Sequence, residues 1–333
     1  MTRVDRLLAL TSRPERICGL MMDADAYFAD DYRSARGKFL AACRAARLLP
    51  QSYAASAGDA EHRLPLAETV RLGDPAARHM MVVCGGDRKA DALCCSAIEV
   101  GWLTEFATAV LPRDSAVLFV HHGPAPATGG ELPSQAGPPP EWEDDLLAKV
   151  EKRYAEYARE KGVDALGAPL PHTDRQKTAG YPAALLDSMV RWLDSAADGR
   201  IVFVDVRVGL GPFGEAEIVP CHAADSEAAR RVRNWFELAD SPTGDHAIAP
   251  QQPDSLTAGL IRRLPEAEVT TFSVAFGTYS MMSVLDTLTS RPRDAEVPDP
   301  RQLLYPDDTA WRTAVWRSAI VVLQRTLTAI HAD

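Results

Sequence analysis

The stretch Arg200-Ile-Val-Phe-Val-Asp-Val-Arg-Val-Gly-Leu-Gly-Pro-Phe-Gly214 decides the fold that the sequence predicts. Its β-branched, apolar run over 201–206 has the composition of a buried strand, and the glycines and proline that follow predict a tight loop. Asp205 and Arg207 are two positions apart, so a strand would place them on one face. Ligands of open α/β sheets bind at the carboxyl ends of the strands, so this charged pair marks a candidate site.

Strands and helices alternate along the chain. This alternation predicts an α/β fold with a mixed, largely parallel central sheet covered by helices on both faces. We expect a single domain over 1–333, with a flexible loop near 123–140 where Pro, Gly and Ala predominate. The predicted strands are 64–73 (an edge strand), 79–83, 116–120, 201–206, 217–219 and 269–276, and the predicted helices are 23–47, 92–110, 141–161, 181–197, 226–239, 256–264 and 307–330.

The bulk composition argues against several classes of protein. The formal net charge of −10 at pH 7 disfavours nucleic-acid binding, which needs a dense cationic surface. No apolar run approaches the roughly 18 residues that span a bilayer. The first residues are too few and too charged for a signal peptide, so we expect a cytoplasmic protein without a membrane partner. The six cysteines form no CxxC pattern and are interpreted as buried thiols.

Two motifs resemble a bacterial, poorly characterised branch of the zinc carboxypeptidase superfamily. The stretch YFADDYRSARGKFL at 27–40 is similar to the family's Y-F-x-x-D-Y-x-x-A-R-x-K-F-L, and its charged residues are interpreted mostly as a solvated helix face. The stretch DVRVGLGPFG at 205–214 is similar to the family's D-L-H-T-G-L-G-P-[FY]-G. The resemblance extends over about 27–278 and implies a zinc-carboxypeptidase-like fold.

The residues that hold zinc in that family are replaced in this chain. The family's H-x-x-E loop corresponds to Arg88 and Asp91, and its third ligand corresponds to Arg207. A guanidinium group stays protonated and has no free lone pair for a cation. The family's catalytic Glu, in V-E-F-G-T, corresponds to Ala275, which cannot transfer a proton. The resemblance therefore implies the scaffold without the zinc chemistry, and we expect neither a metal nor another cofactor.

Two arginines in a former metal site leave two interpretations open. If the fold is kept, Arg88 and Arg207 converge beside Asp91. They can form an Arg–Asp–Arg cluster that balances charge and fills the cavity. They can instead bind a sulfate, phosphate or carboxylate through forked hydrogen bonds. The predicted catalytic residues are Asp91, His121, His122 and Asp205, and the predicted substrate-binding residues are Asp87, Arg88, Arg207, Glu215 and Tyr279.

These candidates support two hypotheses of function. The first is a metal-free biosynthetic enzyme of specialised metabolism that acts on a small, anionic, amino-acid-like substrate, free or attached to a carrier. Intramolecular cyclisation, in which an amine displaces sulfate or phosphate, is one such reaction. The second is a catalytically inactive homologue that serves as a structural subunit beside a protein partner. A binding module for a basic partner rests only on the net charge and is the weakest alternative.

Overall fold

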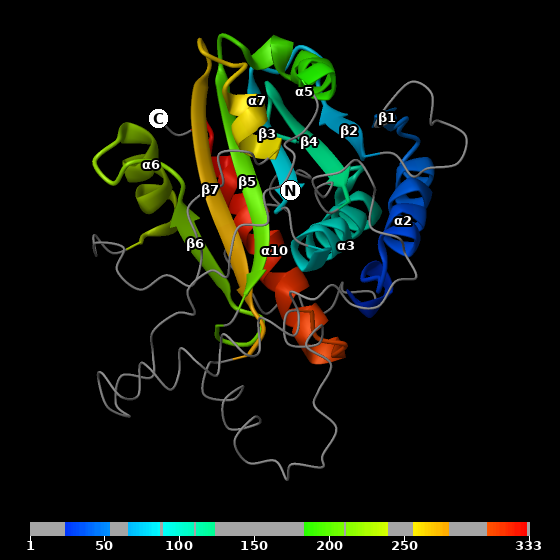
Figure 1. Ribbon diagram of the computed structural model, residues 1–333. Coiled ribbons are helices and arrows are strands. Elements are labelled where there is room, and N and C mark those ends of the chain that lie inside the picture. Colours follow the sequence, from blue (N-terminus) through cyan, green and yellow to red (C-terminus); the bar gives the residue numbers. More distant parts are fainter. Residues whose placement is uncertain are drawn as a thin grey trace, which may run out of the picture.

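The computed structural model describes residues 24–53, 66–86, 89–109, 111–123, 183–209, 211–238, 256–279 and 305–331. Within these ranges, seven strands form one sheet with helices on both faces (Figure 1). The strands are β1 (Gln51–Tyr53), β2 (Ala67–Gly73), β3 (His79–Gly85), β4 (Ser115–His122), β5 (Arg200–Gly209), β6 (Ala216–Pro220) and β7 (Glu268–Gly277). The helices are η2 (Ala24–Tyr27), α2 (Tyr32–Ala45), α3 (Lys89–Phe106), α5 (Ala183–Val190), η4 (Arg191–Ala196), α6 (Glu227–Phe236), α7 (Leu256–Ile261) and α10 (Thr309–Ala329).

The strand order is β1-β2-β4-β3-β5-β7-β6. The four central strands, β4, β3, β5 and β7, run parallel, and β1, β2 and β6 are antiparallel to their neighbours. The predicted mixed, largely parallel α/β sheet is therefore confirmed. The prediction of an edge strand at 64–73 is wrong, because β2 pairs with β1 on one side and β4 on the other.

β5 is longer than its apolar run predicts. The predicted strand ends at Val206 and a glycine loop follows, but β5 continues to Gly209, so Arg207 lies inside the strand. The extension follows from pairing, because β7 runs beside β5 as far as Gly277. On the other side β3 ends opposite Val206, and backbone groups beyond that point need other partners.

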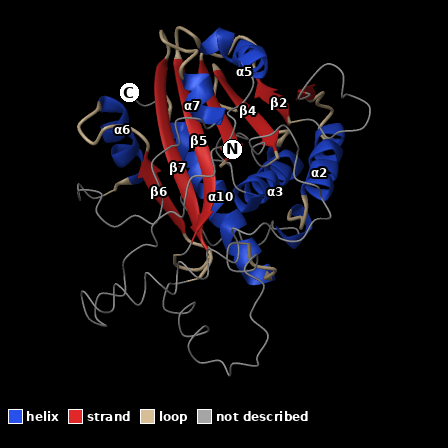
Figure 2. Cartoon of the chain, in the orientation of Figure 1, coloured by secondary structure: helices blue, strands red, loops and turns tan. Residues whose placement is uncertain are grey.

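Helices cover the two faces of the sheet (Figure 2). The buried apolar side chains of the two faces belong to separate clusters. The even-numbered positions of β5 from Val202 to Val208 pack with α3, α6 and α10. The apolar stripe of α10 is buried there, through Trp316, Ile320, Leu323, Leu327 and Ile330. The odd-numbered positions Ile201 and Phe203 pack with α5, η4 and α7. In Figure 1, α7 lies in front of the sheet and α10 behind it. Asp205 and Arg207 continue the odd-numbered row on the α7 face.

The helix boundaries differ from the predicted ones for local reasons. The predicted helix 23–47 is divided into η2 and α2, because the Asp31 side chain accepts the Ser34 N–H at 2.8 Å and starts α2. The glycine at the end of β3 allows a close approach of α3. A Cβ added to Gly85 would lie 3.0 Å from Cβ of Cys95, so a larger residue would push α3 away from the sheet.

Some expectations concern other parts of the chain. The predicted helix 141–161 lies outside the described residues, and so does the predicted loop 123–140 apart from Gly123. None of the helices in the described ranges combines the length and the apolar composition needed to cross a membrane.

Candidate functional site

Asp205 and Arg207 form a buried ion pair near the carboxyl end of β5. Asp205 is 1% exposed and Arg207 8% exposed. Nε and Nη2 of Arg207 donate to the same carboxylate oxygen, Oδ2 of Asp205, at 3.0 Å and 2.7 Å. Burial alone would lower the pKa of Arg207, but Asp205 and then Asp91 raise it above its ordinary value. The guanidinium therefore stays charged and is held by one edge.

The other edge of this pair is open within the part of the chain that the structure describes. Oδ1 of Asp205 is buried and accepts no hydrogen bond there. Nη1 of Arg207 likewise makes no hydrogen bond to a described residue. A buried carboxylate oxygen without a partner is costly, so native proteins rarely leave one without a reason. The pair thus offers an acceptor and a donor that the described protein groups do not use.

Asp91 has a structural partner at this end of the sheet. It is 1% exposed, and its Oδ1 accepts the Val208 N–H at 2.9 Å. β3 has already ended at that level, so the carboxylate takes the place of the next ladder carbonyl. Its other oxygen packs on Gly86, where an added Cβ would lie 2.5 Å from Oδ2. This predicted catalytic residue therefore anchors the extension of β5.

The other predicted substrate-binding residues are dispersed or undescribed. Asp87 and Arg88 lie outside the described residues, so the convergence of Arg88 with Arg207 stays a prediction. The Glu215 side chain is exposed, and its carbonyl accepts the Gly277 N–H at 2.9 Å. Tyr279 packs against Phe213 with ring centroids 5.8 Å apart, and burial followed by Asp308 raises its pKa.

The adjacent residues His121 and His122 lie on opposite faces of the sheet. Both belong to β4, which ends at His122, two residues beyond the predicted strand 116–120. His122 lies on the α7 face, with its Nε2 2.9 Å from the Gly85 carbonyl and its Nδ1 2.7 Å from the Gly123 carbonyl. His121 lies on the α3 face, away from Asp205. The two histidines are adjacent in sequence, but the alternation of side chains along β4 puts them on opposite faces of the sheet.

His121 belongs to a second buried polar cluster. Its Nε2 is 3.1 Å from the Ser96 hydroxyl. Its Nδ1 is 3.5 Å from Oε2 of Glu68, and neither of these two atoms makes a hydrogen bond within the described chain. The other oxygen of Glu68 accepts from Nε of Arg36. Burial lowers the pKa of His121 despite the opposing effect of Glu68, so the ring is neutral at pH 7.

The aromatic-rich motif of α2 encloses this histidine. Phe39 and Tyr32 stack with His121 at centroid distances of 4.5 Å and 5.3 Å. Tyr32, Arg36 and Phe39 are spaced i, i+4 and i+7, so one face of α2 supplies all three contacts. The interpretation of the helix's charged residues as a solvated face is therefore wrong for Arg36, which reaches the fully buried Glu68.

Sequence reasoning missed several polar groups near the two clusters. Ser273 on β7 lies opposite Asp205, and its hydroxyl is 3.3 Å from the Cys221 thiol. Burial raises the pKa of Cys221, which keeps the thiol protonated at neutral pH. The register between β5 and β7 brings Ser273 beside Asp205, and the sequence alone does not show this register. For Glu68 there was one local signal, an acidic residue within an otherwise mostly apolar strand.

The observed contacts do not fit the zinc that the family resemblance would imply. The guanidinium of Arg207 is bound to a carboxylate and has no lone pair, and one oxygen of Asp91 is already bound to a backbone N–H. Across the described ranges, no three His, Cys, Asp or Glu side chains are grouped to hold a metal ion.

Comparison with protein families gives one match. A family model described as a protein of unknown function, DUF2817, matches residues 28–123 and 184–318, well over half of the sequence. The chain belongs to this family. The matched segments of this DUF2817 protein include α2, with its aromatic motif, and β5, with the Asp205–Arg207 pair. None of the curated proteins matches the sequence. The zinc carboxypeptidase resemblance and the replaced ligands remain predictions.

Several solved structures are similar to this DUF2817 protein over most of its length. The Macrostomum lignano glutaminyl cyclase has 12% identity and a TM-score of 0.39, with 98% of this chain and 89% of that chain covered. An Acidobacteriales bacterium glutaminyl cyclase has 9% identity and a TM-score of 0.40, with coverages of 90% and 85%. The Legionella pneumophila aminopeptidase LapA has 8% identity and a TM-score of 0.35, with coverages of 88% and 64%. Similarity this low carries no functional assignment.

Proposed function

We propose that this DUF2817 protein is a metal-independent enzyme that binds a small amino-acid-like zwitterion through Asp205 and Arg207. One observation carries the proposal: Oδ1 of Asp205 and Nη1 of Arg207 make no hydrogen bond within the described chain, although both belong to one clamped, buried pair. An ammonium group complements the open carboxylate oxygen, and an anionic group complements the open guanidinium edge.

The local charge balance favours a zwitterion over a simple anion. The described groups are one guanidinium and the carboxylates of Asp205 and Asp91, which together sum to −1 formally. Arg88 would bring this sum to zero if it points toward the site. A free sulfate or phosphate would meet two nearby carboxylates, whereas a molecule with its own ammonium group offsets them.

A displacement reaction suits this arrangement of acceptor and cation. A substrate amine would attack a carbon that bears a sulfate or phosphate group, forming the C–N bond as the C–O bond breaks. The proton lost by the amine would pass to the carboxylate of Asp205, and Arg207 would stabilise the departing anion. The product is a cyclic amine together with the released oxyanion, and no electrons are gained or lost.

The competing interpretation is a structural ion pair in an inactive subunit of a complex. A purely structural pair gains most when all its donors and acceptors are satisfied. An open carboxylate oxygen alone does not separate the two interpretations, because Oε2 of Glu68 is also buried without a partner in the described chain. At Asp205 the open oxygen is accompanied by the open guanidinium edge of Arg207, and this combination favours a ligand site. The same residues would then be needed for binding and dispensable for assembly with a partner.

Calorimetric titration with O-phospho-L-serine tests the proposal. We expect saturable one-to-one binding by the wild-type protein and binding about 10- to 100-fold weaker in Arg207→Met, from the loss of a charge-assisted hydrogen bond. Arg207→Lys keeps the positive charge but loses the forked guanidinium donors, and it takes the place of Arg207→Met if that variant fails to fold. Arg230→Met on the exposed face of α6 is the matched control and should bind normally.

Two results would overturn the proposal. One is a wild-type protein that binds neither O-phospho-L-serine nor inorganic phosphate or sulfate. The other is stoichiometric zinc in the purified protein by elemental analysis, together with loss of binding when a chelator removes it.

A further inference from the structure

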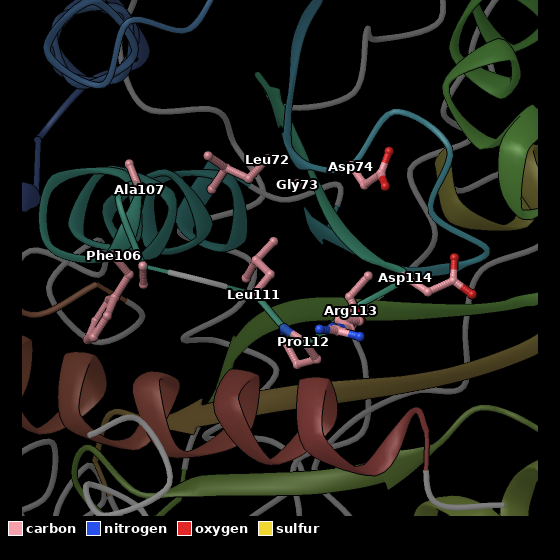
Figure 3. A pocket seen from close by; sticks show the side chains of 11 residues that line it. Leu72, Gly73, Asp74, Phe106, Ala107, Leu111, Pro112, Arg113 and Asp114 are labelled. Carbon is pink, nitrogen blue, oxygen red and sulfur yellow. The ribbon is translucent and has the colours of Figure 1, made fainter. Parts of the chain in front are cut away.

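A cavity of about 460 Å³ lies at the opposite end of the sheet from Asp205 and Arg207. Its volume is within the range of small-molecule sites. Figure 3 shows the side chains around it, which come from the end of β2, the end of α3 and the segment that leads into β4. Leu72, Phe106, Leu111 and Pro112 give it an apolar wall, and Ser115 lines it as the first residue of β4. Its remaining lining includes the charged residues Asp74, Arg113 and Asp114.

The Ser115 hydroxyl forms a close pair with a histidine. Its Oγ is 2.5 Å from Nε2 of His331, just beyond the end of α10. Arg200 on β5 donates to the Ile330 carbonyl at 2.9 Å, which fixes the last turn of α10 at the amino end of the sheet. Burial and then His79 lower the pKa of His331, so its imidazole is neutral at pH 7 and has a lone pair for a hydroxyl proton.

Two neighbours hold this pair in place. The His79 ring meets the His331 ring edge-on, with centroids 4.5 Å apart. Gly73 at the end of β2 has φ +100°, and a Cβ there would lie 2.5 Å from the Ser115 carbonyl oxygen. Only glycine permits β2 to approach Ser115 this closely in that conformation. The serine is thus buried in rigid structure, beside a base and next to a cavity.

We propose that Ser115 and His331 form a nucleophile–base dyad that hydrolyses uncharged esters with a short acyl chain, which the apolar wall of the cavity accommodates. Oγ of Ser115 attacks the ester carbonyl as Nε2 of His331 takes the hydroxyl proton. The ester C–O bond then breaks, and the imidazolium returns the proton to the leaving alkoxide. Water hydrolyses the acyl-serine by the same steps, giving a carboxylic acid and an alcohol.

Hydrolysis of p-nitrophenyl butyrate tests this activity. We expect Ser115→Ala and His331→Gln each to lower kcat/KM at least 100-fold. Ser52→Ala, which removes an exposed hydroxyl on β1, should leave the rate unchanged.

Peptide mapping after treatment with a fluorophosphonate gives a second readout, and its main measurement uses only the wild-type protein. The proposal expects the phosphonyl group on Ser115 of the wild-type protein, and markedly slower labelling of that residue in His331→Gln. An unmodified Ser115 in the folded wild-type protein, or hydrolysis that survives in Ser115→Ala, would overturn it.

Discussion

The two buried charge clusters near the carboxyl ends of β4 and β5 differ in how their polar atoms are used. Around His121, two aromatic rings close over the imidazole and the polar groups face one another, although Nδ1 of His121 and Oε2 of Glu68, 3.5 Å apart, have no hydrogen-bond partner in the described chain. In the Asp205–Arg207 pair, one edge is clamped and the other has no partner in the described chain. A closed cluster stabilises the fold and an open one can bind a ligand, so similar residue types serve different ends.

Loss of the carboxylate should lower the free energy of unfolding more in the closed cluster around His121 than in the open Asp205–Arg207 pair. Glu68→Ala removes the partner of both Arg36 and His121, and we expect a loss of about 3–5 kcal/mol in the free energy of unfolding, measured in urea. Glu227→Ala, an exposed position of α6, should cost less than about 0.5 kcal/mol. A loss for Glu68→Ala as small as the control's would show that the cluster is not a closed structural unit.

A substitution in the open Asp205–Arg207 pair should change ligand affinity more than it changes the free energy of unfolding. Asp205→Asn keeps an oxygen for the Arg207 donors and removes only the charge, so we expect about 2 kcal/mol of destabilisation in the same urea assay. Affinity for O-phospho-L-serine should fall about tenfold or more, because the ammonium group loses its counter-ion. Unchanged affinity would place the ligand elsewhere.

The sequence predicted the fold better than it predicted these clusters, for a physical reason. Strands such as β3, β5 and β7 carry apolar runs whose composition and spacing are local properties, so their positions were predicted well. The Arg36–Glu68 pair joins residues far apart in sequence, and long-range register decides such a contact, which a single sequence does not contain directly. The Asp205–Arg207 pair is local, and the strand period placed both residues on one face, but it did not predict that Asp205 would be the partner of Arg207.

The same reason explains the histidines and the boundaries. The predicted strand 116–120 stops at Val120 because the apolar run ends there, but pairing with β2 extends β4 through His121 and His122. β1 carries too little apolar pattern to be predicted as a strand, and β2 was therefore placed at the edge. Pairing with neighbours overrides local propensity in each case.

The smallest expected effect concerns Glu99, which is fully buried beside the closed cluster. Burial raises its pKa well above its ordinary value of 4.5, so the folded protein holds a proton that the unfolded chain releases. The free-energy cost of keeping Glu99 protonated in the folded protein is absent below pH 4.5. This cost grows as the pH rises toward the folded-state pKa. Glu99→Gln should therefore be stabilising by about 1 kcal/mol at pH 7 and nearly neutral at pH 4, in urea unfolding at the two pH values. Equal effects at both would contradict a raised pKa.

A structure of the protein soaked with O-phospho-L-serine tests the central claim most directly. The account predicts the phosphate within hydrogen-bond distance of Nη1 of Arg207 and the ammonium group within the same distance of Oδ1 of Asp205. A guanidinium turned toward bulk solvent, or an open edge satisfied by other protein groups with no ligand bound, would contradict it.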